Sequence, residues 1–275
     1  MIATLAEVLG PAKAGGYAVA GLVCLGWEDA RAYVAAAEAL GAPVILQAGP
    51  GARAHMPVRV WGAMFRALAE GAQVPVVAHL DHGAGLAECV AGIEAGFSSV
   101  MFDGSRLPLA ENIAQTARIA EAAHRRGVSV EAELGFVGYA AGEASQATDP
   151  AEAARFGTET GVDALAVSVG NVHLMQGAGA AVDWARLAAV AACGLPLVIH
   201  GGSGVSGADR LRMAASGVSK INIGTELRQA FGAALRGVLA GNRDTFDRLE
   251  ILRGCEPALH GAARAAILSC GWKGV

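Results

Sequence analysis

Eight short apolar segments recur along the chain, and a longer helix-forming segment follows most of them. Their starts are separated by roughly 30 residues, which is the length of a strand plus a crossover helix. Such a repeat predicts parallel strands that alternate with helices. The predicted strands begin at Tyr17, Pro43, Val74, Ser98, Val128, Ala164, Leu195 and Lys220.

Helical patterns between these strands cover residues 27–40, 85–96, 109–127 and 149–161, and several begin at Asp or Pro and end at Gly. An open, doubly wound sheet is the alternative to a closed barrel. Eight units without a composition break or a linker favour closure. We therefore expect one (β/α)8 TIM barrel over residues 1–275, with a C-terminal helical extension from about residue 235.

Composition excludes several classes of protein. Charged residues make up 17% of the chain, the net charge is -4, and no block of like charge occurs, so neither a nucleic-acid surface nor a basic membrane-binding face is expected. The N-terminus lacks a signal-peptide pattern, and no apolar run approaches the ~18 residues of a membrane span. The five cysteines form no CxxC pair, which is typical of reduced thiols in a cytoplasmic protein.

Polar residues gather where the predicted strands end. The segment "VAHLDHGA" (77–84) is an example, because an apolar run stops at ionisable side chains. The chemistry of (β/α)8 barrels collects at the carboxyl ends of their strands, so these positions indicate a site. They are Gln47, Asp81, His82, Asp103, Glu133, His173, His200 and Asn222.

Three histidines follow three different predicted strands: His82, His173 and His200. A single histidine is usually a hydrogen-bonded structural residue. Three imidazoles at one rim of a barrel are typical of a zinc site, and three protein ligands leave one position open for a substrate. The barrel brings them together only if it closes as predicted.

Two glycine-containing loops predict a phosphate site. The segment "HGGSGVSGADRL" (200–211) contains Gly201, Gly202 and Ser203, and a predicted helix N-terminus follows it. The segment "KINIGTEL" (220–227) ends the last predicted strand. The loops after the seventh and eighth strands often bind phosphate in these barrels. The second loop contributes Asn222, Ile223, Gly224 and Thr225.

Six segments, in order from about residue 17 to 232, resemble the class II, zinc-dependent fructose- and tagatose-bisphosphate aldolases. They are "VPVVAHLDHG", "GFSSVMFDGSRLPLAENI", "VEAELG", "GVDALAVSVGNVH", "LPLVIHGGSGV" and "SKINIGTELRQAF". The resemblance implies a reversible cleavage of a ketose (bis)phosphate to dihydroxyacetone phosphate and an aldehyde. It also implies a homo-oligomer, either a dimer or a tetramer, whose small-molecule partner is a sugar phosphate.

The resemblance assigns roles to residues of this chain. His82, His173 and His200 match zinc ligands, and Asp81 matches the acid/base residue at the C4 hydroxyl. Asp103 and Glu133 match carboxylates of a second or displaced metal site. Two structural roles are equally plausible from the sequence: Asp103 as the cap of a turn, and Glu133 as the partner of a barrel arginine. The resemblance leaves two questions open: whether another divalent metal takes the place of zinc, and whether a monovalent cation binds beside the phosphate. The groups matching the dihydroxyacetone phosphate site are Gly201 to Ser203 and Asn222 to Thr225.

The chain departs from the family pattern on the aldehyde side. Asparagines after the first strand are absent from "GLVCLG" (21–26), and Gly49 stands where the family has a serine. Arg106 and Leu174 replace residues that are often His and Gly. The acidic loop motif is reduced to Glu143. We expect Gln47 to support the site, and His79 either supports it or has a structural role. Arg53 is the candidate to restore binding of a phosphorylated aldehyde, and Arg53 or Arg106 could hold another anion.

Three functions remain open from the sequence. The first is a zinc-dependent ketose-phosphate aldolase. The second is a lyase of the same family with a different aldehyde partner, either phosphorylated or unphosphorylated. The third, a non-catalytic barrel subunit, would be favoured by loss of Asp81 or of the histidines, and the chain retains them.

Overall fold

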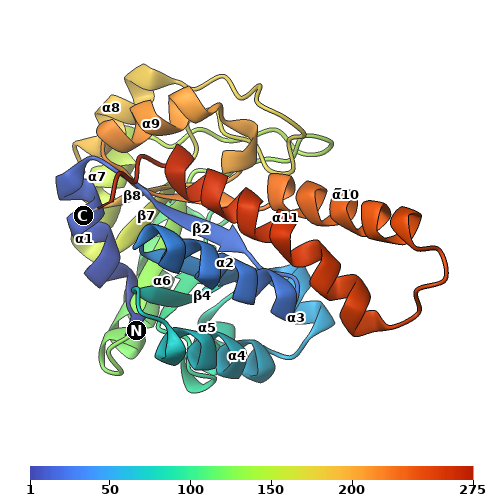
Figure 1. The fold of residues 1–275 in the computed structure, drawn as a ribbon. Helices are drawn as coiled ribbons and strands as arrows, with labels where there is room; N and C mark the ends of the chain where they lie inside the picture. The colour runs from blue at the N-terminus through green and yellow to red at the C-terminus, as the bar shows by residue number, and fades with distance from the viewer. Residues whose placement is uncertain (275) are drawn as a thin grey trace.

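The computed structural model describes residues 1–274. Eight parallel strands close into a barrel, because β2 pairs with both β3 and β9, and β4 pairs with β5 (Figure 1). The predicted (β/α)8 TIM barrel is confirmed. A short additional strand, β1 (Ile2–Ala3), pairs with the start of β4. The barrel strands are β2 (Val19–Val23), β3 (Val44–Ala48), β4 (Val76–Gly83), β5 (Ser99–Phe102), β6 (Ser129–Leu134), β7 (Ala164–Val167), β8 (Leu197–Ile199) and β9 (Val218–Ile223).

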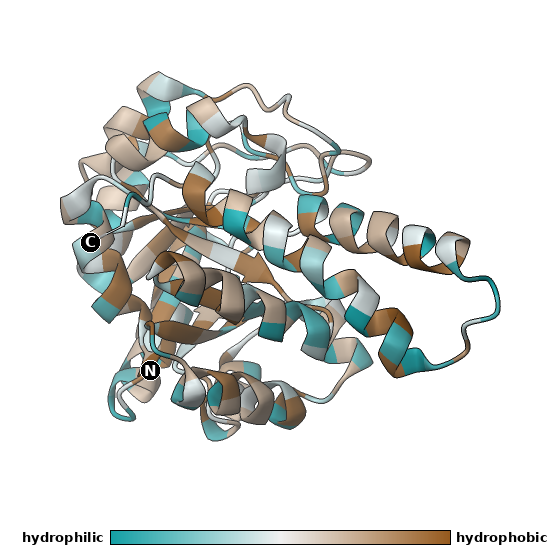
Figure 2. Cartoon of the chain, viewed as in Figure 1, coloured by the Kyte–Doolittle hydropathy of each residue, from teal (hydrophilic) through white to brown (hydrophobic). Residues whose placement is uncertain are grey.

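Helices surround this barrel, and their hydrophilic residues lie mainly on outward-facing surfaces (Figures 1 and 2). All four helical segments predicted from the sequence are present. The helices are α1 (Leu5–Gly15), α2 (Trp27–Leu40), α3 (Pro50–His55), α4 (Val58–Gly71), α5 (Leu86–Glu94), α6 (Leu109–His124), α7 (Pro150–Thr160), α8 (Trp184–Ala191), α9 (Gly207–Ala215), α10 (Thr225–Gly241) and α11 (Arg248–Ser269), with a 3-10 turn η1 at Gly202–Gly204.

The strands are apolar without alternation because both faces of the sheet are covered. In β3, for example, all five residues are buried. This is the pattern of a parallel sheet whose outer face packs on helices and whose inner face fills the barrel. The burial explains why the strands appear in the sequence as continuous apolar runs.

Helix α1 closes the amino-terminal end of the barrel. Thr4 caps this helix, and its side chain forms a capping box with Glu7. Leu5 and Leu9 of α1 pack in one buried cluster with barrel residues such as Val19 and Val77. These apolar side chains fill the barrel interior at this end.

Helices α10 and α11 form a hairpin that projects beyond the barrel (Figure 1). Residue 235, where the extension was predicted to begin, lies inside α10. The hairpin exposes Leu239, Phe246 and Leu249. Self-association as a dimer or tetramer stays a prediction.

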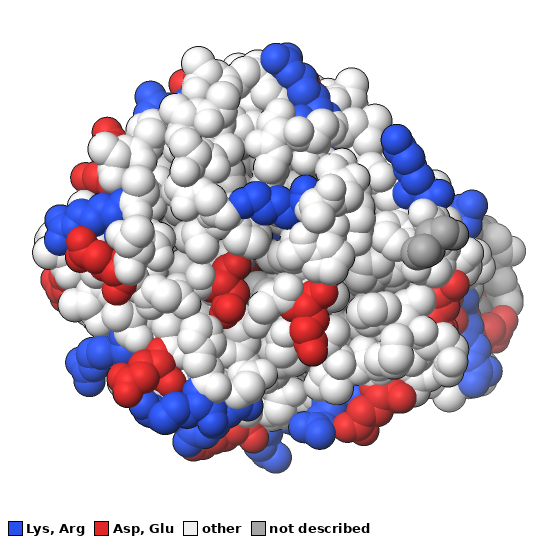
Figure 3. Space-filling view, turned by 90° about the vertical axis from the view of Figure 1, so that its left-hand side faces the viewer, with Lys and Arg blue, Asp and Glu red and all other residues white. Residues whose placement is uncertain are grey.

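Charge is dispersed on the side of the molecule where α1 lies. Figure 3 shows basic and acidic side chains interspersed there, mostly toward the edges of the view. Within residues 1–274, the helices include none that combines the length and apolarity required to cross a membrane.

Candidate active site

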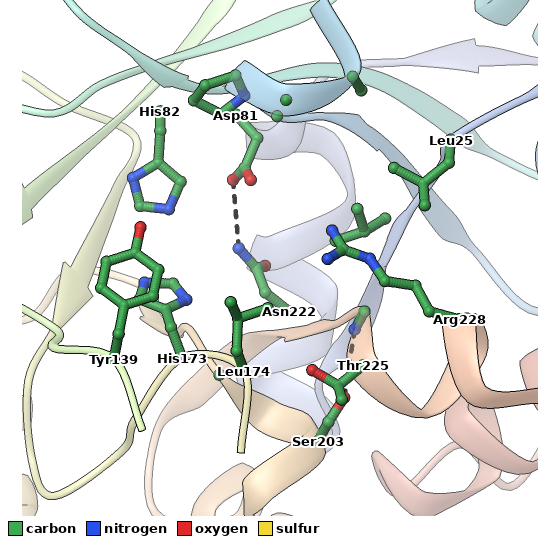
Figure 4. A pocket seen from close by; sticks show the side chains of 17 residues that line it. Leu25, Asp81, His82, Tyr139, His173, Leu174, Ser203, Asn222, Thr225 and Arg228 are labelled. Carbon is green, nitrogen blue, oxygen red and sulfur yellow. Dashed lines mark hydrogen bonds between the residues drawn. The ribbon is translucent and has the colours of Figure 1, made fainter. Parts of the chain in front are cut away.

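A pocket of about 360 Å³ lies at the carboxyl ends of the strands. The polar side of this pocket contains Asp81, His82, His173, Gly201, Ser203, Asn222, Gly224 and Thr225 (Figure 4). His200, Gly202 and Ile223 adjoin them in sequence, and His200 and Ile223 are fully buried. The apolar wall of the pocket consists of Val23, Leu25, Gly49, Ala52 and Leu174. The predicted acid/base residue, the three histidines and the two glycine-containing loops therefore meet in one place.

The three predicted histidine ligands form a compact cluster. One ring nitrogen from each of His82, His173 and His200 lies within 4.8 Å of the other two. The ring centroids of His82 and His200 are 4.6 Å apart, and those of His82 and His173 are 5.4 Å apart. The cluster can present three imidazole nitrogens to one ion, which is the donor set that zinc prefers.

Carboxylates fix the orientation of two of these rings. His82 Nδ1 donates to Asp103 Oδ2 at 2.9 Å, and His200 Nε2 donates to Glu131 Oε1 at 3.0 Å. The remaining nitrogens, His82 Nε2 and His200 Nδ1, face each other at 2.9 Å. Two nitrogen lone pairs at this separation repel each other unless a proton or a metal cation lies between them. A divalent ion that separates the rings fits the donor set.

The electrostatics of His82 and His173 support the same conclusion. Burial opposes the charge on His82, but Asp81, Asp103 and Glu133 raise its pKa to about 10. Burial and the neighbouring imidazoles lower the pKa of His173 to about 3, so this ring is neutral. The cluster thus favours a positive charge at its centre and already holds one imidazole in the form that binds metals.

Asp103 and Glu133 form a second possible ligand set with His82, again within 4.8 Å. Asp103 also caps the turn, because its Oδ1 accepts from the hydroxyl of Ser105 at 2.6 Å. The alternative that Glu133 pairs with an arginine is wrong. Glu133 Oε1 accepts from the Val137 amide, whereas Oε2 is buried without a hydrogen-bond partner among the described residues. Burial raises the pKa of Glu133.

Asp81 stands beside the histidine cluster and is 6% exposed at the pocket. Its Oδ1 lies 3.4 Å from Asn222 Nδ2, the contact drawn in Figure 4. Burial favours the neutral carboxyl, but His82, His200 and Lys220 together hold the pKa of Asp81 below its usual value. Asp81 is therefore a carboxylate that can accept a proton from a ligand in the pocket.

Arg53 holds the backbone of this region and does not line the pocket. Its guanidinium donates to the carbonyls of Ala48, Asp81 and His82, and it pairs with Glu88. His82 adopts φ 50°, a left-handed conformation that is uncommon for a non-glycine residue. The Arg53 contacts help to maintain this turn. The prediction that Arg53 restores phosphate binding is not supported, because its nitrogens are engaged elsewhere.

The two glycine-containing loops lie beside each other, as predicted. Gly201 has φ 65°, and a Cβ there would lie 2.2 Å from the Val172 carbonyl oxygen. Ser203 Oγ accepts from the amides of Gly224 and Glu226, both at 3.3 Å. Helix α10 begins at Thr225, so the positive end of its dipole lies beside Ser203 and favours an anion there.

The three remaining predicted residues differ in their surroundings. His79 is fully buried, with Nε2 4.0 Å from Asp81 Oδ1. Gln47 is also fully buried, and neither of its amide atoms has a partner among the described residues. Glu143 is exposed and forms two hydrogen bonds with Arg106, so the loop carboxylate is held outside the pocket lining.

Two polar or aromatic pocket residues, Arg228 and Tyr139, and one carboxylate, Glu131, were not predicted from the sequence. Arg228 directs its guanidinium into the pocket (Figure 4). Its position three residues after Thr225, in the first turn of α10, was the available signal. Tyr139 stacks on His173 with ring centroids 5.1 Å apart. Glu131, two residues before Glu133 and so on the same strand face, was the signal for the partner of His200.

Comparisons with known proteins agree with this geometry. The sequence model of the class II fructose-bisphosphate aldolase family matches residues 3–275. The YdjI aldolase from Escherichia coli K12 is 32% identical, with a TM-score of 0.87 over 100% of this chain and 99% of that one. Fructose-bisphosphate aldolase from Campylobacter jejuni is 23% identical and shares the fold, with a TM-score of 0.83 over 98% and 95% of the two chains. The chain therefore belongs to the class II fructose-bisphosphate aldolase family.

Proposed function

We propose that this protein is a divalent-metal-dependent aldolase, with zinc as the metal, that reversibly cleaves a ketose phosphate to dihydroxyacetone phosphate and an aldehyde. One observation carries the proposal: three imidazole nitrogens within 4.8 Å of one another adjoin a pocket that also holds Asp81 and both glycine-containing loops. The ion, when bound, acts as a Lewis acid that polarises the ketone and stabilises the charge left by C–C cleavage.

Proton transfer is assigned to Asp81. In cleavage its carboxylate takes the proton of the C4 hydroxyl, the C3–C4 bond breaks, and the electron pair of that bond stays with the dihydroxyacetone phosphate portion. C3 then takes up a proton and Asp81 gives up its own, with water as the carrier of both protons. In condensation Asp81 returns the proton to the new hydroxyl. The depressed pKa of Asp81 supports this role, because the group is ready as a base.

The phosphate of dihydroxyacetone phosphate is assigned to the loops at Gly201–Ser203 and Asn222–Thr225. The left-handed Gly201 permits close approach of the backbone, and the positive end of the α10 dipole, where Ser203 Oγ already binds the Glu226 amide, favours a negative charge. A monovalent cation at this phosphate is compatible with the proposal and is not required by it.

The aldehyde is assigned to the apolar wall, with Arg228 as its one nearby cation among the described pocket residues. Val23, Leu25 and Gly49 offer no side-chain hydrogen-bond donor there. A pocket without such donors discriminates weakly between hydroxylated or phosphorylated groups. This favours an aldehyde with at most one anionic group and keeps an unphosphorylated aldehyde as the second candidate.

The test is to incubate the metal-loaded protein with dihydroxyacetone phosphate and a panel of aldehydes, and to identify the products. We expect aldol products, and we expect kcat/KM for glyceraldehyde 3-phosphate to exceed that for glycolaldehyde by less than about a thousandfold, or ~4 kcal/mol. A larger ratio would favour an ordinary bisphosphate aldolase. Absence of any aldol product would contradict the proposal.

A further inference from the structure

Four polar side chains that the proposed mechanism does not use are enclosed within the barrel. They are His79 of β4, Ser99 of β5, Glu131 of β6 and Lys220 of β9, and all are fully buried. Strands β4, β6 and β9 are not neighbours in the sheet, so these side chains can meet only in the barrel interior. A buried lysine is rare and requires a compensating partner.

We infer that Glu131 and Lys220 are positioning residues that hold the His200 ring with Nδ1 directed toward the metal ligand cluster. The inference rests on the proposed metal-dependent function. The two oxygens of Glu131 are divided between two partners. Oε1 accepts from His200 Nε2 at 3.0 Å, and Oε2 accepts from Lys220 Nζ at 2.6 Å. With Nε2 engaged by Glu131, Nδ1 is the ring nitrogen left for a metal, and it faces His82 at 2.9 Å.

Lys220 stabilises the ionised form of Glu131 in the buried interior of the barrel. Burial penalises the charge of Glu131, but Lys220, His200 and His79 hold the pKa of Glu131 well below its usual range. A well-packed apolar pair of similar volume is often as stable as a buried ion pair, or more stable. Stability of the core therefore gives no reason for the pair, whereas control of the His200 tautomer does.

His79 links the same lysine to Asp81. Its Nε2 accepts from Lys220 Nζ at 3.2 Å, and its Nδ1 lies 2.8 Å from Ser99 Oγ. Burial and the nearby charge of Lys220 lower the pKa of His79 to about 3, so the ring is neutral and can accept this hydrogen bond. His79 Nε2 is also 4.0 Å from Asp81 Oδ1. The buried Lys220 thus contacts Glu131, the partner of the predicted metal ligand His200, and His79, the neighbour of Asp81.

The test compares Glu131→Gln, Lys220→Met and the double variant Glu131→Gln/Lys220→Met. Glutamine can present its NH2 group to His200 Nε2 and so permit the opposite tautomer. Lys220→Met leaves the Glu131 charge without its main partner and should destabilise the protein, whereas the double variant removes both charges and should recover thermal stability. Glu256→Gln, which removes a surface carboxylate paired with Arg31, is the control.

Two readouts do not depend on activity. Competition with a chromophoric chelator gives the affinity for Zn²⁺ or Co²⁺, and ¹⁵N NMR of the imidazoles in metal-free protein gives the tautomer of His200. We expect Glu131→Gln and the double variant to bind metal about 10–100-fold more weakly than wild type. In both variants the Nε2–H form of His200 should lose its dominance. The control should match wild type in both readouts.

The outcomes separate this inference from the proposed function. Recovery of stability in the double variant without recovery of metal affinity supports a positioning role. Recovery of both, or wild-type affinity and tautomer in Glu131→Gln, overturns it and leaves only a structural ion pair. If wild-type protein binds neither metal, the proposed function fails and this inference fails with it.

Discussion

The two sides of the pocket are built in different ways. On the polar side, side chains are held by buried contacts. Carboxylates orient His82 and His200, and Arg53 donates to the backbone carbonyl of Asp81. The side chains of the apolar wall make no hydrogen bonds, because they are aliphatic or absent, and Leu174 projects from a loop with φ 57° and is 50% exposed. Groups that must act on electrons and protons are held rigidly, whereas the wall assigned to the aldehyde depends on shape.

This contrast implies that substitutions on the two sides have different consequences. On the polar side, removal of one group leaves a neighbouring charge or lone pair without its partner. The loss of activity should therefore be large and should be similar for all substrates. On the apolar wall, few polar atoms depend on any one side chain. Effects there should be smaller and should depend on the substrate.

The largest effect is expected from metal removal, because the ion supplies chemistry that no side chain of the polar side replaces. Stripping with a chelator should lower activity by at least ~10³-fold, and adding back Zn²⁺ or Co²⁺ should restore it. Metal content and activity are measured on the same sample. Full activity without metal, or borohydride trapping of a substrate imine, would rule out the mechanism.

Replacement of Asp81 by alanine should be the next largest change. Loss of a proton-transfer group typically lowers turnover by about 10²–10⁴-fold. Metal affinity should change little, because Asp81 is outside the histidine ligand set. Steady-state kinetics and chelator competition measure the two properties separately. Unchanged turnover would remove Asp81 from the mechanism.

Arg228 tests whether the apolar wall contains an anion subsite. Arg228→Met should raise KM for an aldehyde carrying a phosphate or carboxylate by about 10–100-fold, since a hydrogen bond to a charged group contributes ~1.5–3 kcal/mol. Glycolaldehyde, which has no charge, should show little change and serves as the internal control. An equal rise in KM for both aldehydes would mean that Arg228 does not bind the anionic group of the aldehyde and acts with the residues of the polar side instead.

Metal binding should release protons, because the proton on His82 must leave. The pKa of His82 is raised to about 10, so the metal-free ring is protonated at neutral pH, whereas His173 is already neutral. Apparent metal affinity should therefore rise with pH, by roughly tenfold per unit between pH 7 and 9. Calorimetric titrations in buffers of different ionisation enthalpy should report about one proton per ion. No proton release would contradict the charge distribution described here.

The smallest effect is expected from Gly49→Ser on the apolar wall. Gly49 has φ -78°, and a Cβ there would lie 3.4 Å from Asp81 Oδ2, so serine should fit without a strained backbone. The new hydroxyl should shift the kcat/KM preference toward glyceraldehyde 3-phosphate by less than about tenfold. A preference shift of several hundredfold would mean that this one donor decides the choice of aldehyde.

Much of the fold was predictable because it depends on local patterns. The spacing, length and apolar composition of the runs identified all eight barrel strands, and the polar residues after them pointed to Asp81 and the three histidines. Two terminal features were missed. The two residues of β1 are too few to give a pattern, and α1 covers the end of the barrel instead of its side.

The partners within the site could not be read from local patterns. Lys220 and Glu131 are 89 residues apart in sequence, and Lys220 and His79 are 141 apart, so their contacts exist only after the barrel closes. Arg53 was a candidate for phosphate binding because of its position after a strand, but its direction depends on carbonyls from a neighbouring loop.

The sequence alone therefore determined which residue types stand at the ends of which strands, and with them the family. Only the tertiary structure decided which nitrogens of His82 and His200 face each other, which arginine enters the pocket and which carboxylate supports a ligand. The physical reason is that strand and helix periodicity follow from neighbours along the chain, whereas hydrogen bonds between non-adjacent strands depend on the curvature and closure of the whole sheet.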